Sequence, residues 1–225
     1  MSFLGILMLD TRFERVLGDV GNIDSYPFPV RLKVVEGAGS LDVVKNGAVS
    51  PELLGRFISA ARGLEAEGAF AITSTCGFLV TVQDDIAAAV KIPVMVSALS
   101  LYSQLVERHG VVGVLTASAP SLGQAAMEAA GLDIDTPLKG MEGCAAFANA
   151  ILKPKDQQLT TLDTKAVEAY AVEQAVKMRR ENPDLGAILL ECGNLPPYAP
   201  AIEMATRLPV YSMLTRLDEL LTSSV

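Results

Sequence analysis

The sequence predicts an α/β protein of two pseudo-symmetric lobes, each a mostly parallel sheet flanked by helices, with the active site between the lobes. Short apolar segments alternate with helical segments along the chain, a pattern typical of a parallel sheet covered by helices. A strand that ends in a cysteine and a glycine occurs twice, at residues 71–77 and 187–193. The first strand of the chain, at residues 3–10, also resembles residues 111–118. The chain therefore repeats one α/β unit.

The repeat sets the expected boundary between the lobes. Cys76 and Cys192 are each followed, at the same distance, by a Pro-Val pair that opens the next strand. A chain of 225 residues with 50% hydrophobic content can bury two small cores of about 100 residues each, or one larger core. The expected lobes are residues 1–100, completed by a C-terminal helix at 212–225, and residues 101–211.

The first half of the chain alternates strands and helices around one long loop. Residues 3–9 form a continuous apolar run, as a strand buried on both faces requires. The loop at residues 10–29 is long for a compact domain and is broken by glycines and prolines, so we expect a lid or a substrate-facing loop, with simple surface packing as the alternative. Ser50 and Pro51 predict a helix start. The further elements expected in this half are strands at 30–35, 69–73 and 92–96 and helices at 51–67, 80–90 and up to Arg108.

The second half repeats the pattern with a few residues inserted before its cysteine. Its first strand lies at residues 111–118, and its cysteine strand leads to Cys192. The elements expected between them are a helix at 120–130, a short strand near Ile134, a helix at 144–152 and a long helix at 160–181.

The composition excludes several classes of partner. The formal net charge is −8 with only 18 Lys and Arg residues and no basic run, so we expect neither nucleic acid nor a membrane surface as a partner. No apolar run reaches the roughly 20 residues that span a bilayer, and the apolar start lacks the basic residues of a signal peptide. Three cysteines, an odd number, favour reduced thiols. We expect a cytoplasmic homo-oligomer.

Cys76 and Cys192 are the candidate catalytic residues. Each stands at the carboxyl end of a predicted parallel strand, where open sheets bind their ligands. A turn into a helix exposes N–H groups that hold an anion and favours thiolate, so we expect a cysteine pKa below the free value of about 8.5. The following glycine lets the backbone come close to a ligand. The N–H groups expected to hold a small anionic substrate are those of Gly77, Phe78, Gly193 and Asn194.

Two cysteines that face each other across a cleft suit one kind of chemistry. A thiolate removes a proton from one face of a carbon acid, and a thiol returns a proton to the other face. The sequence has no glycine-rich phosphate loop, no His-Glu-x-x-His and no Cys-x-x-Cys, and it has a single histidine, so we expect no metal and no cofactor. The alternative is that both thiols are simply buried apolar residues. Cys144 has no counterpart in the repeat and is expected to be such a core residue.

The cysteines and three further segments carry a family resemblance. Together with the thiols, residues 5–11, 112–118 and 190–196 resemble the aspartate/glutamate/hydantoin racemase superfamily over nearly the whole chain. The resemblance implies two similar lobes, cofactor-independent racemisation or isomerisation, and cysteines that act as acid and base. It also implies that residues 10–11 lie near the site and that residues 116–118 bind the substrate carboxylate. The substrate-binding candidates outside the glycine turns are Asp10, Thr11, Thr75, Thr116, Ala117 and Ser118.

The residues after each cysteine depart from the pattern of the amino-acid racemases. Gly77-Phe78 stands where those enzymes usually have Asn-Thr, and Gly193-Asn194 stands where they usually have Thr-His or Thr-Glu. These changes disfavour free aspartate or glutamate and leave another carboxylate or a hydantoin-like ring. The superfamily also includes maleate cis-trans isomerases and arylmalonate decarboxylases. Since the decarboxylases keep only one cysteine, the presence of both argues against decarboxylation.

The predicted function is a cofactor-independent racemase or epimerase, an isomerase that inverts the α-carbon of a small carboxylate or amino-acid-like substrate. Two alternatives stay open: a cis-trans isomerase of a small unsaturated dicarboxylate that forms a covalent cysteine adduct, and a non-catalytic protein that binds a small anion. No obvious arginine lies near either motif, so backbone N–H groups and hydroxyls are expected to bind the carboxylate. The alternative is a distant arginine, such as Arg12 or Arg15, that folds over the cleft. Glu191 is expected to supply a charge behind the site, with a simple cap of the strand end as the alternative.

Overall fold

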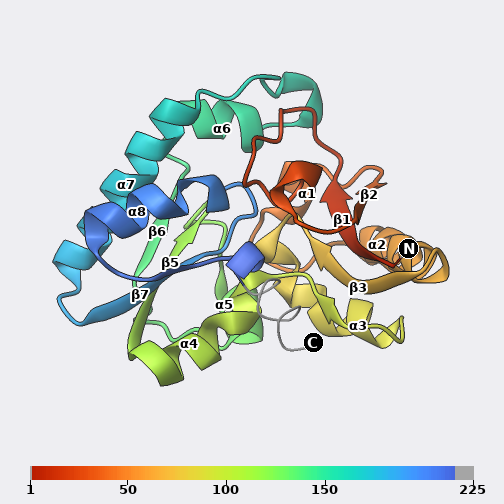
Figure 1. Cartoon of the computed structure of the whole chain (residues 1–225), viewed down its shortest axis with the longest axis horizontal. Coiled ribbons are helices and arrows are strands. Elements are labelled where there is room, and N and C mark those ends of the chain that lie inside the picture. Colours follow the sequence, from red (N-terminus) through yellow and green to blue (C-terminus); the bar gives the residue numbers. More distant parts are fainter. Residues whose placement is uncertain (1, 216–225) are drawn as a thin grey trace.

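The computed structural model describes residues 2–215, and in this part of the chain two parallel sheets lie side by side, each with helices packed on it (Figure 1). The strand order is β2-β1-β3-β4 in the first sheet and β6-β5-β7-β8 in the second. Both sheets therefore have the same topology, which confirms the predicted α/β fold of two pseudo-symmetric lobes. The strands are β1 (Phe3–Leu9), β2 (Val30–Val35), β3 (Ala69–Ser74), β4 (Val94–Met95), β5 (Val111–Thr116), β6 (Leu138–Gly140), β7 (Leu185–Leu190) and β8 (Val210–Tyr211).

The helices begin and end where local sequence signals place them. At the start of α2, Pro51 occupies the first turn and Ser50 Oγ accepts a hydrogen bond from the Leu53 N–H at 3.2 Å. None of the helices within residues 2–215 is long and apolar enough to cross a membrane. The α-helices are α1 (Ser40–Val43), α2 (Pro51–Ala66), α3 (Gln83–Ala88), α4 (Tyr102–His109), α5 (Gln124–Ala130), α6 (Ala145–Ile151), α7 (Thr164–Glu181) and α8 (Ala199–Thr206). The 3-10 helices are η1 (Ile23–Ser25), η2 (Gly77–Val82), η3 (Ala98–Leu101), η4 (Lys155–Gln157) and η5 (Pro196–Tyr198).

Three predicted elements differ from the structure. The prediction of a strand near Ile134 is wrong, because this residue lies in a turn with 89% of its surface exposed. The strand of this region is β6, a few residues later. The helix expected at 80–90 is the 3-10 helix η2 followed by the short α3. The helix expected from residue 120 begins only at Gln124, after a turn. The C-terminal helix expected at 212–225 falls mostly outside the described residues.

The loop at residues 10–29 crosses from the first lobe to the second. The Glu14 N–H donates to the Thr160 carbonyl at 3.0 Å, and the Val20 N–H donates to the Gly193 carbonyl at 3.0 Å. The Arg12 N–H donates to Gln158 Oε1, also at 3.0 Å. These backbone contacts hold the loop over the carboxyl ends of the strands in both lobes.

The glycines after the two cysteines lie where the lobes meet. A Cβ atom on Gly77 would lie 2.4 Å from the Glu191 carbonyl oxygen, and one on Gly193 would lie 2.6 Å from the Thr75 carbonyl oxygen. Each glycine therefore packs against the residue that precedes the cysteine of the other lobe. In this structure the two glycines let the lobes approach each other closely, and their expected close approach to a ligand stays a prediction.

Replacing Gly193 by alanine is expected to lower the free energy of unfolding by about 2 kcal/mol, because the new methyl group meets backbone atoms that cannot move aside cheaply. Gly55→Ala is the matched control. Gly55 lies inside α2 with open space around it, so alanine there is expected to raise stability by roughly 0.5–1 kcal/mol. Urea denaturation of both variants checks the pair, and a neutral Gly193→Ala would contradict the tight lobe contact.

Candidate active site

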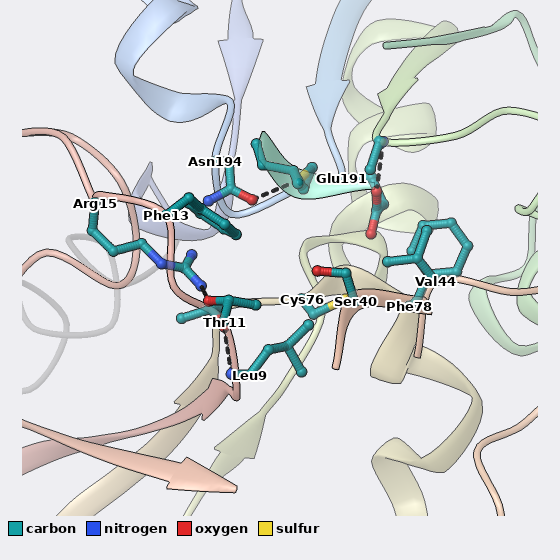
Figure 2. A pocket seen from close by; sticks show the side chains of 14 residues that line it. Leu9, Thr11, Phe13, Arg15, Ser40, Val44, Cys76, Phe78, Glu191 and Asn194 are labelled. Carbon is teal, nitrogen blue, oxygen red and sulfur yellow. Dashed lines mark hydrogen bonds between the residues drawn. The ribbon is translucent and has the colours of Figure 1, made fainter. Parts of the chain in front are cut away.

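Cys76 and Cys192 line one pocket between the lobes, at the carboxyl ends of β3 and β7 (Figure 2). Each thiol is buried, with 6% of its residue surface exposed. The centre of a water molecule can occupy only about 10 Å³ of the pocket, roughly the space that one water needs. The described conformation is therefore closed, and a substrate can enter only when a covering segment moves.

The pocket gathers residues from both lobes and from the loop at residues 10–29. Several sequence-predicted candidates line it: Thr11, Thr75, Cys76, Phe78, Ala117, Cys192 and Asn194. The residues that complete the lining are Leu9, Phe13, Arg15, Ser40, Val44, Ile151 and Glu191. Among these, sequence reasoning had named only Arg15 and Glu191. The length of the loop was the available signal for Phe13, and the other apolar positions had none.

The remaining candidates lie outside the pocket lining. The side chain of Asp10 pairs with Lys155 Nζ and accepts from the Gly37 N–H, contacts that hold the pKa of its carboxyl below the usual range. Ser118 donates to Ser121 Oγ at 2.9 Å. Thr116 does not line the pocket, but its hydroxyl donates a hydrogen bond to Glu191, which does. The two glycines, Gly77 and Gly193, lie in the contact between the lobes.

Glu191 is a buried carboxylate with one oxygen satisfied and one free. Its Oε2 accepts hydrogen bonds from Thr116 Oγ1 at 2.8 Å and from the Ala117 N–H at 3.3 Å. Its Oε1 is buried and has no hydrogen-bond partner in the part of the chain that the structure describes. Burial raises the pKa of Glu191 to about 7, against the lowering effect of these two donors.

The expected lowering of the cysteine pKa values is wrong for this closed pocket. Burial raises the pKa of Cys76, and the nearby Glu191 charge raises it further. The pKa of Cys192 is raised well above its usual value for the same two reasons. The N–H groups of Phe78 and Asn194 act in the opposite direction but are outweighed. Both cysteines are therefore thiols at neutral pH in this conformation.

Arg15 brings a positive charge into the same pocket. Its Nη1 lies 3.2 Å from Asp19 Oδ1, and its Nη2 donates to Thr11 Oγ1 at 3.1 Å. The guanidinium also lies 4.4 Å from the centre of the Phe13 ring. Its Nε is buried and finds no hydrogen-bond acceptor among residues 2–215. The loop thus supplies the arginine that the cysteine motifs lack, whereas Arg12 Nη1 donates to the Asp156 carbonyl on the surface.

A chain of hydrogen bonds links this loop to one of the two thiols. Asn194 Nδ2 donates to Asp19 Oδ2 at 2.5 Å, and Cys192 Sγ donates to Asn194 Oδ1 at 3.4 Å. Asp19 is buried, with 2% of its surface exposed. Within residues 2–215 no group of three or more His, Cys, Asp or Glu side chains is placed to hold a metal ion.

Comparison with known proteins agrees with this architecture. The profile of the family described as Asp/Glu/Hydantoin racemase matches residues 46–215. A dimethylsulfoniopropionate lyase of Durusdinium sp. clade D is 31% identical over 222 residues, which cover 96% of this chain and 72% of that one.

Two solved structures show the same fold at low identity. A cysteine-for-glycine mutant of arylmalonate decarboxylase, in a sulfate-associated form, superposes with a TM-score of 0.61 at 16% identity over 93% of this chain and 87% of that one. Allantoin racemase from Klebsiella pneumoniae superposes with a TM-score of 0.58 at 14% identity over 100% of this chain and 89% of that one. The resemblance found in the sequence is confirmed: the chain belongs to the Asp/Glu/hydantoin racemase family.

Proposed function

We propose that the chain is a lyase that removes the α-proton of a small zwitterionic carboxylate with a cysteine and expels a cationic β-substituent. Dimethylsulfoniopropionate, the compound named in its relative from Durusdinium, is the substrate that fits this description. It carries a carboxylate at one end and a dimethylsulfonium group at the other. Racemases and this lyase share the first step, proton abstraction next to a carboxylate, so the proposal keeps the chemistry expected of the cysteines.

One observation carries the proposal: the pocket contains a guanidinium and a carboxylate, groups of opposite charge, and each has one buried polar atom that is not hydrogen-bonded. Arg15 Nε and Glu191 Oε1 have no hydrogen-bond partner within residues 2–215, although leaving a buried polar atom unsatisfied is costly. Figure 2 shows Arg15 and Glu191 on opposite sides of the view, with Cys76 between them. Such a pocket fits a substrate whose opposite charges are separated along its length, with its α-carbon near the thiols.

The aromatic ring of Phe78 supports the binding of a methylated cation at the end of the pocket where Glu191 lies. Figure 2 shows Phe78 on the same side of the view as Glu191. The face of an aromatic ring attracts a cation that has no N–H to donate, such as a quaternary ammonium or a sulfonium group. The ammonium group of an amino-acid substrate needs hydrogen-bond acceptors, which suits the polar residue of the amino-acid racemases at this position. A methylated cation needs none, which suits Phe78.

The reaction balances with the residues in the pocket. While the pocket is open, a cysteine first gives its S–H proton to solvent. The thiolate that results takes the α-hydrogen as a proton, and the C–H electron pair forms the carbon–carbon double bond. The β-carbon–sulfur bond breaks, and its electron pair leaves on sulfur as neutral dimethyl sulfide, with acrylate remaining. The cysteine then returns its proton to solvent. Arg15 is placed to bind the carboxylate and to stabilise the charge that develops on it in the transition state.

A racemase or epimerase is the second candidate, and the repeated strand ends favour it. Two cysteines in equivalent places are what a two-base inversion of an α-carbon uses. A cis-trans isomerase of a dicarboxylate fits less well, because its second carboxylate would meet Glu191.

The test is to incubate the purified chain with dimethylsulfoniopropionate and to measure dimethyl sulfide by gas chromatography and acrylate by liquid chromatography. We expect equal amounts of both products. Parallel incubations in heavy water with amino acids, hydantoins and small carboxylates report α-deuterium exchange and inversion. Inversion of any of these compounds without release of dimethyl sulfide would reject the lyase and favour the racemase.

A further inference from the structure

We infer that the two thiols have fixed and different roles: Cys76 is the base, and Cys192 is kept protonated by Asn194, whose orientation is set by Asp19 from the loop at residues 10–29. The inference rests on the proposed function, since it assigns the residue that takes the α-proton. It makes Asp19 a positioning residue that acts on Cys192 through Asn194.

The asymmetry begins two residues after each cysteine, where the repeat places Phe78 in one lobe and Asn194 in the other. The backbone N–H at each of these positions favours the thiolate of its own cysteine. The side chains differ, because phenylalanine cannot accept a hydrogen bond and Asn194 Oδ1 lies 3.4 Å from Cys192 Sγ. Of the two pocket cysteines, Cys192 alone therefore has a side-chain acceptor for its S–H among the described residues.

Asp19 decides which end of Asn194 faces the sulfur. Asp19 Oδ1 accepts from Arg15 Nη1 at 3.2 Å and from the Gly21 N–H at 2.7 Å, which fixes the carboxylate. Its Oδ2 accepts from Asn194 Nδ2, so turning the amide over would set two acceptor oxygens against each other. Asn194 Oδ1 must then point at Cys192. A thiol can donate to this oxygen, whereas a thiolate is repelled by it.

The surrounding charges favour the same assignment. Glu191, Asp19 and Cys76 face Cys192, and each of them raises its pKa. Glu191 also raises the pKa of Cys76, but there the positive charge of Arg15 lowers it. The loop thus supplies a positive charge, on Arg15, that lowers the pKa of Cys76, and a negative charge, on Asp19, that raises the pKa of Cys192. Because Arg15 and Asp19 belong to the same loop, closing this loop over the pocket places both charges near the thiols at once.

The order in which the thiols ionise can be measured without substrate. Iodoacetamide reacts with thiolates, and peptide mass spectrometry after alkylation at a series of pH values separates Cys76 from Cys192, with Cys144 as an internal reference. Because both thiols lie in one pocket, loop opening affects both rates, and their ratio reports the ionisation. We expect the alkylation profile of Cys76 to lie about one pH unit or more below that of Cys192.

Two substitutions test the link through Asn194. Asp19→Asn frees the amide to turn its N–H₂ toward the sulfur, and Asn194→Ala removes the acceptor while the Asp19 charge stays. Both are expected to move the Cys192 profile to lower pH by about one unit and to leave Cys76 in place. Asp24→Asn is the matched control, an exposed carboxylate on the same loop, and is expected to change neither profile.

The outcomes separate this inference from the proposed function. Wild-type Cys192 ionising before or together with Cys76 overturns the assignment, even if dimethyl sulfide is released. An unmoved Cys192 profile in Asn194→Ala overturns the role of the amide, and this variant decides the matter if Asp19→Asn does not fold. The expected order and shifts without any release of dimethyl sulfide would support the fixed roles and reject the lyase.

Discussion

Cys76→Ser is expected to lower the turnover of dimethylsulfoniopropionate by about 10⁴-fold, because serine cannot serve as a base at neutral pH. Cys192→Ser is expected to lower turnover far less, by below about 100-fold, because dimethyl sulfide leaves as a neutral molecule and needs no acid. Initial rates of dimethyl sulfide release, at saturating substrate, measure both variants. Each variant replaces one sulfur atom by oxygen at an equivalent strand end, so each serves as the control for the other.

The contrast between these two variants distinguishes one base from two. A two-base racemase loses inversion in either variant, since each thiol acts on one face of the α-carbon. Equal and complete losses in both serine variants would therefore contradict the fixed roles. Cys144→Ser is the control: this buried residue stands at the start of α6, its thiol donates to the Ala166 carbonyl and not into the pocket, and its loss is expected to leave turnover unchanged.

The sequence predicted the features that repeat. The two cysteine strands share one register, so both sheets, their order of elements and the position of each thiol at a strand end followed from the pattern. The short strand of the second lobe could not be placed from the sequence, because β6 has only three residues and so shows no hydrophobic period. Ile134 was misleading, since a single apolar residue between two aspartates is as compatible with a turn as with a strand.

The chemistry of the site depends on contacts that no local pattern records. Arg15 reaches the thiols because its loop bonds to the second lobe, as in the contact of the Glu14 N–H with the Thr160 carbonyl. The cysteine pKa values were misjudged for a related reason: a strand end followed by glycine indicates exposed N–H groups, but the depth of burial is set by how the lobes close. Gly77 illustrates the same limit, since its neighbour Glu191 lies in the other lobe.

Glu191→Gln is expected to make the protein more stable at pH 8 and a poorer enzyme. The folded chain binds a proton at Glu191 up to a pKa of about 7, whereas the unfolded chain loses it near 4.5. Stability linked to this group is thus full below pH 4.5 and falls as pH rises to 7, by about 3 kcal/mol. Glutamine is neutral throughout, so the variant should lose this slope. Urea denaturation at pH 5 and pH 8 measures it.

The same substitution removes the negative charge that is proposed to bind the sulfonium group. We expect KM for dimethylsulfoniopropionate to rise by about 10–100-fold, the loss of one interaction with a charged group. Glu142→Gln is the matched control, because this exposed carboxylate of the second lobe accepts from the Ala119 N–H and lies outside the pocket lining.

The two effects of Glu191→Gln must appear together if the buried carboxylate is kept for binding. A variant that is more stable at pH 8 but has an unchanged KM would leave the free oxygen of Glu191 without a ligand and contradict the zwitterionic pocket. A variant that is less stable at pH 8 would show that the contacts with Thr116 and Ala117 outweigh the burial of the charge. A gain in stability with a loss in substrate binding is the expected signature of a charge that the folded chain tolerates for its substrate.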